Sequence, residues 1–128
     1  MESLALLATA ILLGGMTFYS FGFAPVLFKQ LPIDQVRPLL RGTFPYYYAA
    51  VIALSAVCVP LAWMQSAMAG LLMLAIALST LYARQLLMYQ INAAADAKDN
   101  KAFGRLHGLS VVIQLIQLGL AGWALLLL

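Results

Sequence analysis

Four polar side chains in the last apolar segment are of types that can bind ligands or take part in catalysis. His107, Ser110, Gln114 and Gln117 lie in the stretch FGRLHGLSVVIQLIQLGLAGW, which is otherwise mostly apolar. On a helix with about 3.6 residues per turn, all four fall on one side and form a polar stripe. In a membrane, such side chains turn away from lipid and toward protein or enclosed water. We therefore predict that the polar stripe faces the interior of the protein.

Glycines line a second face of the same helix, next to the polar stripe. They are Gly104, Gly108, Gly119 and Gly122. Glycine lets the backbone of another helix come close, so we expect this face to pack against a neighbouring helix. The opposite arc is aliphatic and is left for lipid or for a partner in an oligomer.

Arg41, Arg84, Asn92 and His107 are expected to converge at one depth in the protein. Arg84 and Asn92 are eight residues apart, so they lie on nearly the same face of the third helix. Arg41 precedes the second apolar segment and His107 begins the fourth, at the same end of the molecule. Together with Tyr47 and the polar stripe, these residues make up the candidate ligand-binding site.

The counter-charge of Arg84 is the main question, because no Asp or Glu lies inside an apolar segment. A buried guanidinium without a partner is costly in free energy. The partner must be Asp34, Asp96, Asp99, a group of backbone carbonyls, or an anion from outside the chain. A lipid phosphate or a small carboxylate would bind it bidentately. The alternative is that Arg84 extends to the lipid headgroups.

Metal and haem chemistry finds little support in the sequence. His107 is the single histidine and Cys58 the single cysteine. Zinc sites combine several such ligands, and haem normally needs a second axial ligand. We predict no metal, no cofactor and no catalytic residue. We therefore expect His107 to be a hydrogen-bonded packing residue and Cys58 to be a small apolar residue.

The composition indicates which elements must position these residues. The 128 residues are 65% hydrophobic and 9% charged, with a mean hydropathy of +0.97. A soluble chain has roughly a quarter charged residues, and about 20 apolar residues cross the hydrocarbon core of a membrane. Four segments are long enough: 4–28, 44–64, 68–90 and 104–127. We predict a single transmembrane domain over residues 1–128, an all-α integral membrane protein folded as an up-down four-helix bundle.

The distribution of charge predicts the orientation of the four helices. Six of the basic residues flank two loops: Lys29, Arg37, Arg41, Lys98, Lys101 and Arg105. Loops rich in Lys and Arg stay cytoplasmic, so both are predicted inside and both termini outside, in a bacterial inner membrane. The first segment lacks a basic start, which indicates a retained helix and not a cleaved signal peptide. The basic residues behind the net charge of +3 then set the orientation of the helices in the membrane, and we expect no nucleic-acid partner.

Prolines and polar residues predict where the helices begin and bend. Asp34 can cap a short helix, and Val36–Leu40 mixes apolar and basic residues as a helix on a membrane surface does. Pro45 marks a kink or a restart before the second span, and Pro25 a bend at the end of the first. Tyr46–Tyr48 stand where aromatic residues anchor helices at the membrane interface.

Each of the four spans contributes to an ordered set of motifs. The set consists of GGMTFYSFGFAPVLF, then RGTFPYYY, then Arg84 with Asn92, then FGRLHGLSVVIQLIQL. It resembles the membrane family typified by transmembrane protein 205, which occurs in bacteria and eukaryotes and is largely without an assigned function. The resemblance implies a four-span bundle and no established reaction. It draws attention to Arg41, Pro45, Tyr47, Arg84, His107, Ser110 and Gln117. The family pattern has Asn where this chain has Gln114, which keeps a side-chain amide there.

Three classes of function remain open. The first is binding or transport of an anionic or amphipathic small molecule or lipid, with any transport path built from a homo-oligomer. The second is a structural or accessory subunit whose aliphatic faces pack on larger partners in the lipid bilayer. The third is a membrane redox protein that uses haem or quinone. The lack of a carboxylate inside the spans argues against a proton-coupled cation exporter.

Overall fold

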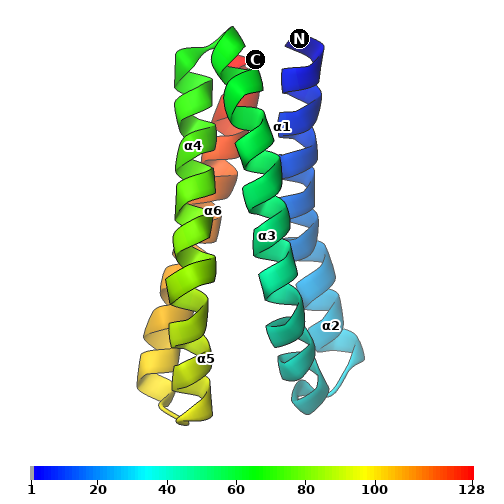
Figure 1. Ribbon diagram of the computed structural model, residues 1–128. Coiled ribbons are helices and arrows are strands. Elements are labelled where there is room, and N and C mark those ends of the chain that lie inside the picture. Colours follow the sequence, from blue (N-terminus) through cyan, green and yellow to red (C-terminus); the bar gives the residue numbers. More distant parts are fainter. Residues whose placement is uncertain (1) are drawn as a thin grey trace.

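Residues 2–128, which the computed structural model describes, form four long helical rods. The rods are Glu2–Gln30, Ile33–Gln65, Ala67–Asp96 and Asn100–Leu127, and each is long and apolar enough to cross a membrane. Neighbouring rods run antiparallel, and the two termini lie at the same end (Figure 1). The prediction of an all-α, membrane-embedded four-helix bundle is confirmed.

The first and third rods each contain a π-helical segment, which was not predicted from the sequence. The first rod consists of α1 (Glu2–Thr17), the π-helical η1 (Phe18–Phe23) and α2 (Ala24–Gln30). The third consists of α4 (Ala67–Tyr82), the π-helical η2 (Ala83–Leu87) and α5 (Met88–Asp96). Such segments are rare and frequently lie at functional sites.

The second rod is one continuous helix, α3 (Ile33–Gln65). Three prolines lie inside it: Pro38, Pro45 and Pro60. The prediction of a short helix separate from the second span is therefore wrong, and of the two alternatives given for Pro45, a kink or a restart, the restart is wrong. Val36 is completely buried, so one side of this stretch packs against the chain, whereas Ile33 and Leu39 on the same helix are exposed. Asp34 lies in the first turn of α3, and the capping position is Pro32.

Short connections join the second rod to the third and the third to the fourth. Between α3 and α4, the Ser66 hydroxyl accepts a hydrogen bond from the Ala69 amide at 3.3 Å. The fourth rod, α6 (Asn100–Leu127), begins after Asp99, whose carboxylate accepts from the Ala102 amide at 3.1 Å. Both contacts satisfy backbone N–H groups that the first turn of a helix leaves free.

The packed core lies in the half of the bundle nearest the termini. Its buried residues come from α1, α3, α4 and α6, and they are Leu12, Met16, Val51, Cys58, Ala62, Ala69, Leu72, Met73, Ile76, Ala121 and Ala124. Cys58 is among them, as expected for a small apolar side chain. Many large apolar side chains, such as Phe18, Leu78 and Ile116, are exposed on the outside, where a membrane would cover them.

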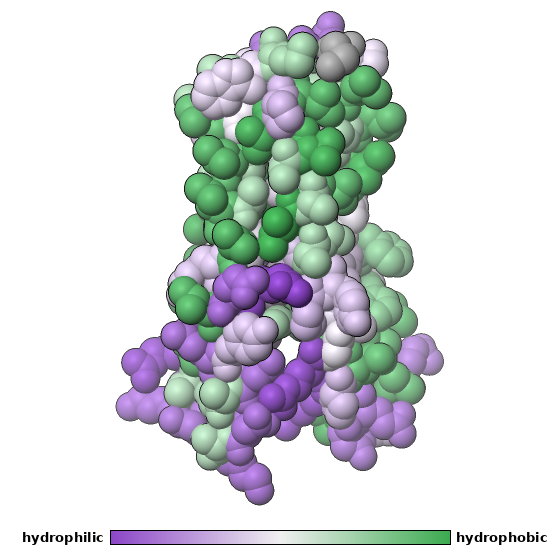
Figure 2. Space-filling view, viewed as in Figure 1, coloured by the Kyte–Doolittle hydropathy of each residue, from purple (hydrophilic) through white to green (hydrophobic). Residues whose placement is uncertain are grey.

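The other half of the bundle, which we call the basic end, divides into two arms. One arm is α2 with the beginning of α3, and the other is α5 with the beginning of α6 (Figure 1). Lys29, Arg37, Lys98, Lys101 and Arg105 are at this end. Figure 2 shows hydrophilic residues gathered over both arms, around an opening between them.

Candidate functional site

A cluster of polar and aromatic side chains joins three rods where the two arms meet the packed core. This tyrosine–amide cluster consists of Tyr19, Ser20, Thr43, Tyr47 and Gln114. The Gln114 side-chain N–H₂ group donates to the Ser20 hydroxyl at 2.7 Å and to the Tyr47 hydroxyl. The Tyr19 and Tyr47 rings stack with centroids 4.0 Å apart and an angle of 12° between planes. The cluster thereby ties η1, α3 and α6 together.

The hydrogens of this cluster can be assigned from its geometry. Thr43 donates to the Leu40 carbonyl at 3.2 Å, so its oxygen accepts from the Tyr19 hydroxyl at 3.0 Å. A glutamine amide has two donor hydrogens, and those of Gln114 have one acceptor each. The Tyr47 hydroxyl accepts from Gln114, and the Gln114 side-chain carbonyl oxygen has no hydrogen-bond partner within residues 2–128.

Gln117 forms a second contact, one helical turn nearer the termini, and this contact is closed. Its side-chain N–H₂ group donates to the Ser79 hydroxyl at 2.7 Å and to the Thr80 hydroxyl at 2.9 Å. Both hydroxyls donate in turn to the Ile76 carbonyl. Gln117 is almost completely buried, so this network joins α4 to α6 as a structural contact.

Arg84 reaches from η2 across to α3. Its Nε–H group donates to the Pro45 carbonyl at 3.2 Å, in a half-buried setting. Within residues 2–128, no carboxylate lies within 4.0 Å of its guanidinium, and its two terminal nitrogens have no hydrogen-bond partner. Of the partners expected for Arg84 from the sequence, the one present in the structure is therefore a backbone carbonyl, that of Pro45. Four N–H donors of the guanidinium stay free for a ligand.

Arg41 and Asp96 form a bidentate ion pair between the two arms. The two terminal nitrogens of Arg41 lie 2.8 and 2.9 Å from the two carboxylate oxygens of Asp96. Both side chains are largely open to solvent, at 46% and 63% exposure. The contact joins α3 to α5, and it uses the carboxylate that the sequence offered as one partner for Arg84.

The predicted convergence of Arg84 and His107 in a single polar network is wrong. His107 is exposed, and its ring lies parallel to that of Phe103 with centroids 5.7 Å apart. Ser110 donates to the His107 backbone carbonyl at 2.7 Å. Asn92 is half-buried, and its side chain has no hydrogen bond to any residue in the range 2–128.

The polar stripe of α6 therefore divides into two parts with different surroundings. Gln114 and Gln117 face the interior, as predicted, because α1, α3 and α4 lie opposite them in the packed half. His107 is exposed and Ser110 is half-buried, and both make their contacts within α6, in the part of the helix that pairs with α5 at the basic end. A helical wheel treats both parts alike, since it contains no information on where neighbouring rods separate.

The glycine face of α6 also differs from the expectation. Gly104, Gly108 and Gly119 are exposed, and Gly122 is half-buried. A Cβ atom placed at any of the four would meet no atom within 4 Å apart from the backbone of its own stretch of helix. No neighbouring helix from residues 2–128 packs on this face, because α6 turns its alanines and Gln117 inward.

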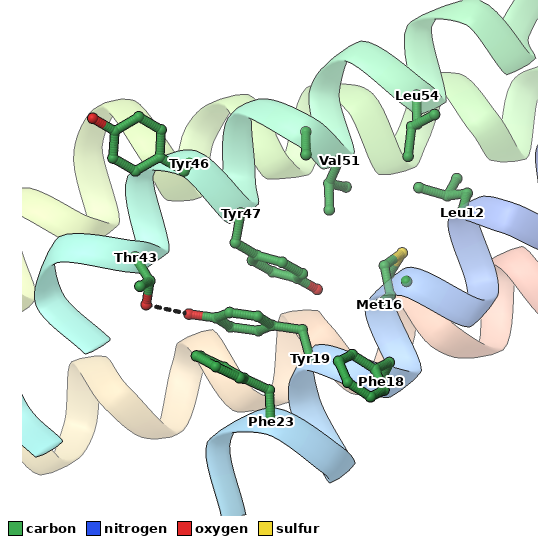
Figure 3. A pocket seen from close by; sticks show the side chains of 12 residues that line it. Leu12, Met16, Phe18, Tyr19, Phe23, Thr43, Tyr46, Tyr47, Val51 and Leu54 are labelled. Carbon is green, nitrogen blue, oxygen red and sulfur yellow. Dashed lines mark hydrogen bonds between the residues drawn. The ribbon is translucent and has the colours of Figure 1, made fainter. Parts of the chain in front are cut away.

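An apolar groove of about 430 Å³ lies beside the tyrosine–amide cluster, between α1 and α3. Figure 3 shows Tyr19, Tyr47 and Phe23 side by side within it, with the Tyr19–Thr43 hydrogen bond at its edge. Tyr47 was predicted from the sequence as a site residue, whereas Tyr19, Ser20 and Thr43 were not. For Tyr19 and Ser20 a signal was present in TFYSFGF, where three hydroxyl-bearing residues interrupt an apolar span.

The comparisons with known proteins yield a family and no activity. The model of a family described as a domain of unknown function (DUF4149) matches residues 7–100, well over half of the chain. No curated protein and no solved structure matches. The matched residues include Arg41, Tyr47, Arg84 and Asp96, whereas the polar stripe of α6 lies beyond them.

Proposed function

Because the chain belongs to the DUF4149 family of domains of unknown function, we propose its function from its geometry: Arg84 binds the anionic head of an amphipathic molecule. The observation that carries this proposal is the half-buried guanidinium whose protein partner is a backbone carbonyl. A carbonyl neutralises no charge, so an anion from outside the chain would complete the site. From the ordered motifs of the four spans, we also propose a relationship to the transmembrane protein 205 family.

The surroundings of Arg84 suit a ligand with both a polar and an apolar part. The opening between the arms gives the polar head a hydrophilic approach from the basic end (Figure 2). Near Arg84 in the sequence, the outer surface of the third rod is apolar, with Leu81, Leu86 and Tyr89 exposed. An acyl or other apolar tail would rest on that surface while the head reached the guanidinium.

Phosphate and carboxylate heads share the chemistry that Arg84 requires. Each offers two oxygens in the geometry that a guanidinium binds bidentately, and such charge-assisted hydrogen bonds are roughly twice as strong as neutral ones. Such a head has two possible sources, a lipid of the bilayer and a free small molecule. The test below separates these two sources.

We place the basic end in the cytoplasm, in a bacterial inner membrane, with both termini on the opposite side. This orientation rests on the clustering of Lys and Arg at one end of the bundle. Single cysteines at Gln65 and Lys98, in a Cys58→Ala background, test it by labelling of intact cells. An impermeant maleimide should label the Gln65→Cys variant and spare Lys98→Cys. The reverse pattern would invert the assignment.

A second candidate, an accessory or self-associating subunit, is favoured by the unfilled glycine face of α6. A Cβ placed at any of these four glycines would meet nothing within 4 Å beyond its own stretch of helix backbone, so the face offers a surface on which another helix could come close. This role is compatible with anion binding, since the glycine face and Arg84 are on different rods.

Thermal unfolding of the purified protein with added ligands tests the anion site. A ligand present at about 100 times its dissociation constant stabilises the folded state by about 2.7 kcal/mol. We expect an anionic lipid to raise the melting temperature of the wild type and a zwitterionic lipid of the same chains to have no effect. Inorganic phosphate and acetate form the second arm, because a site for free anions responds to them without a tail.

Variants at two arginines make the test specific. Arg84→Ala should abolish the stabilisation by anionic lipid, and Arg84→Lys should retain part of it because charge remains without the bidentate geometry. Arg37→Ala is the matched control, since Arg37 is an exposed arginine at the same end. An equal loss of stabilisation in both alanine variants would mean that the overall positive charge of the basic end, and not Arg84 in particular, attracts the lipid. That result would contradict the proposal.

A further inference from the structure

Arg41 and Arg84 both reach across the space between α3 and the third rod. Arg84 extends from η2 to the Pro45 carbonyl of α3, and Arg41 extends from α3 to Asp96 at the end of α5. Arg41 precedes Pro45 by four residues, so the two lie on the same face of α3. The two guanidinium groups thus project into one interhelical space from opposite sides.

The Asp96 carboxylate binds Arg41 in the way that an external anion would. The Asp96 carboxylate holds both terminal nitrogens of Arg41 in the arrangement by which arginine recognises a carboxylate or a phosphate. Exposed ion pairs contribute little to stability, because water competes for both charges. With 46% and 63% of the two side chains exposed, an incoming anion can replace Asp96 at small cost.

We propose, building on the proposed function, that the head is a phosphomonoester bound between Arg84 and Arg41, and that Asp96 is its internal competitor. Without the ligand, the Asp96 carboxylate pairs with Arg41, and binding transfers Arg41 from that carboxylate to the phosphate. A phosphomonoester carries a charge of about −1.5 to −2 and three acceptor oxygens near neutral pH. Two arginines match this charge, whereas a monoanionic phosphodiester or carboxylate is satisfied by Arg84 alone.

The distances along α3 permit this transfer. One helical turn, about 6 Å, separates the backbone of Arg41 from that of Pro45, and an arginine side chain can cover that length. Because Pro45 is the contact of Arg84, a phosphate seated at Arg84 comes within reach of Arg41. Release of Asp96 also removes the ion pair between the arms, so phosphate binding loosens their connection at the basic end.

Binding of two lipids with identical acyl chains to the full-length protein in detergent tests the proposal. The probes are dioleoyl phosphatidic acid, a phosphomonoester, and dioleoyl phosphatidylglycerol, a phosphodiester. Asp96→Asn removes the competitor and should tighten binding of phosphatidic acid about two- to five-fold. Asp34→Asn, which removes an exposed acidic charge from the same end, is the control and should leave the affinity unchanged. Arg41→Ala should erase the preference for phosphatidic acid over phosphatidylglycerol.

The outcomes separate this inference from the proposed function. If Arg84→Ala abolishes binding of both lipids while Asp96→Asn and Arg41→Ala leave the affinities unchanged, the role of Arg41 and Asp96 is overturned and anion binding at Arg84 stands. If Asp96→Asn weakens binding, the ion pair supports the site and does not compete for it, which also overturns the inference. Unchanged binding in Arg84→Ala overturns the proposed function and this inference together.

Discussion

At the scale of single residues, two buried threonines have opposite hydrogen-bonding states. The Thr9 hydroxyl of α1 is completely buried and has no hydrogen-bond partner among residues 2–128. The Thr80 hydroxyl of α4 accepts from Gln117 and donates to the Ile76 carbonyl. A buried hydroxyl costs free energy unless it is paired, so the same replacement should act differently at the two positions.

Thr9→Val should therefore stabilise the protein by about 1 kcal/mol, because it removes an unpaired polar group without changing the volume. Thr80→Val should destabilise it by about 1 kcal/mol or more, because a Gln117 N–H loses its acceptor. Both changes are measured as the free energy of unfolding in a denaturing detergent. A loss of stability in Thr9→Val would show that its hydroxyl has a partner in the folded protein.

The contacts of Gln114 depend on the length of its side chain. Its amide reaches Ser20 on η1 and Tyr47 on α3 at once, and an asparagine is one methylene shorter. Gln114→Asn should lose at least one contact, at a cost of about 0.6–1.7 kcal/mol for an interhelical hydrogen bond in a membrane protein. Gln90→Asn, at an exposed position, is the matched control. Equal unfolding free energies for the two variants would contradict the importance of these contacts.

The sequence predicted part of the candidate site at this scale. The inward direction of Gln114 and Gln117 was predictable, because amides avoid lipid and share one helical face. The positions of His107 and Asn92 were not, since both depend on where the arms separate. Arg84 was identified by its lack of an acidic neighbour in its own span, but its contact with the Pro45 carbonyl requires knowing how α3 and η2 face each other.

At the scale of helices, two glycines provide a direct contrast. A Cβ at Gly70 of α4 would lie 2.5 Å from a ring carbon of Trp63 and 2.9 Å from its Cα, so α3 and α4 touch there. A Cβ at Gly119 of α6 would meet nothing within 4 Å. The first glycine is required by a close approach, whereas the second is open in the single chain.

Gly70→Ala should destabilise the protein by about 1–3 kcal/mol, as overpacking does. Gly119→Ala should be neutral or stabilise it by up to about 1 kcal/mol, because alanine is the better helix former. Thermal unfolding of each variant in detergent gives the comparison. A clear loss of stability in Gly119→Ala would instead reveal that this face packs against a partner, as the second candidate function requires.

The rods themselves were largely predictable, and their internal irregularities were not. Uncharged apolar runs long enough to cross a membrane define each rod whatever its neighbours are. The π-helical segments η1 and η2 involve a local change of hydrogen-bonding partner that leaves the apolar pattern intact. The continuity of α3 through Pro45 could not be predicted either. In membrane helices, neighbouring helices and side chains can satisfy the backbone groups that a proline leaves without a partner.

At the scale of the whole molecule, the tightly packed half and the divided basic end should differ in mobility. The ion pair of Arg41 with Asp96 joins the two arms at the basic end. Spin labels at Arg37 and Lys101, in a Cys58→Ala background, place one probe on each arm. Arg41→Ala should broaden the distance distribution measured by pulsed electron paramagnetic resonance. Labels at Leu7 and Leu126, near the termini, should give the same distribution with and without Arg41. Equal distributions for the arms would show that other contacts hold them.

Native mass spectrometry of the protein released from its own membrane tests anion binding at Arg84 most directly. Arg84→Gln removes the charge while keeping a polar side chain, and Arg37→Gln is the equivalent change at an exposed arginine. The proposed function predicts that the wild type and Arg37→Gln retain a bound anionic amphiphile of defined mass and that Arg84→Gln does not. The same bound mass on all three proteins would contradict it.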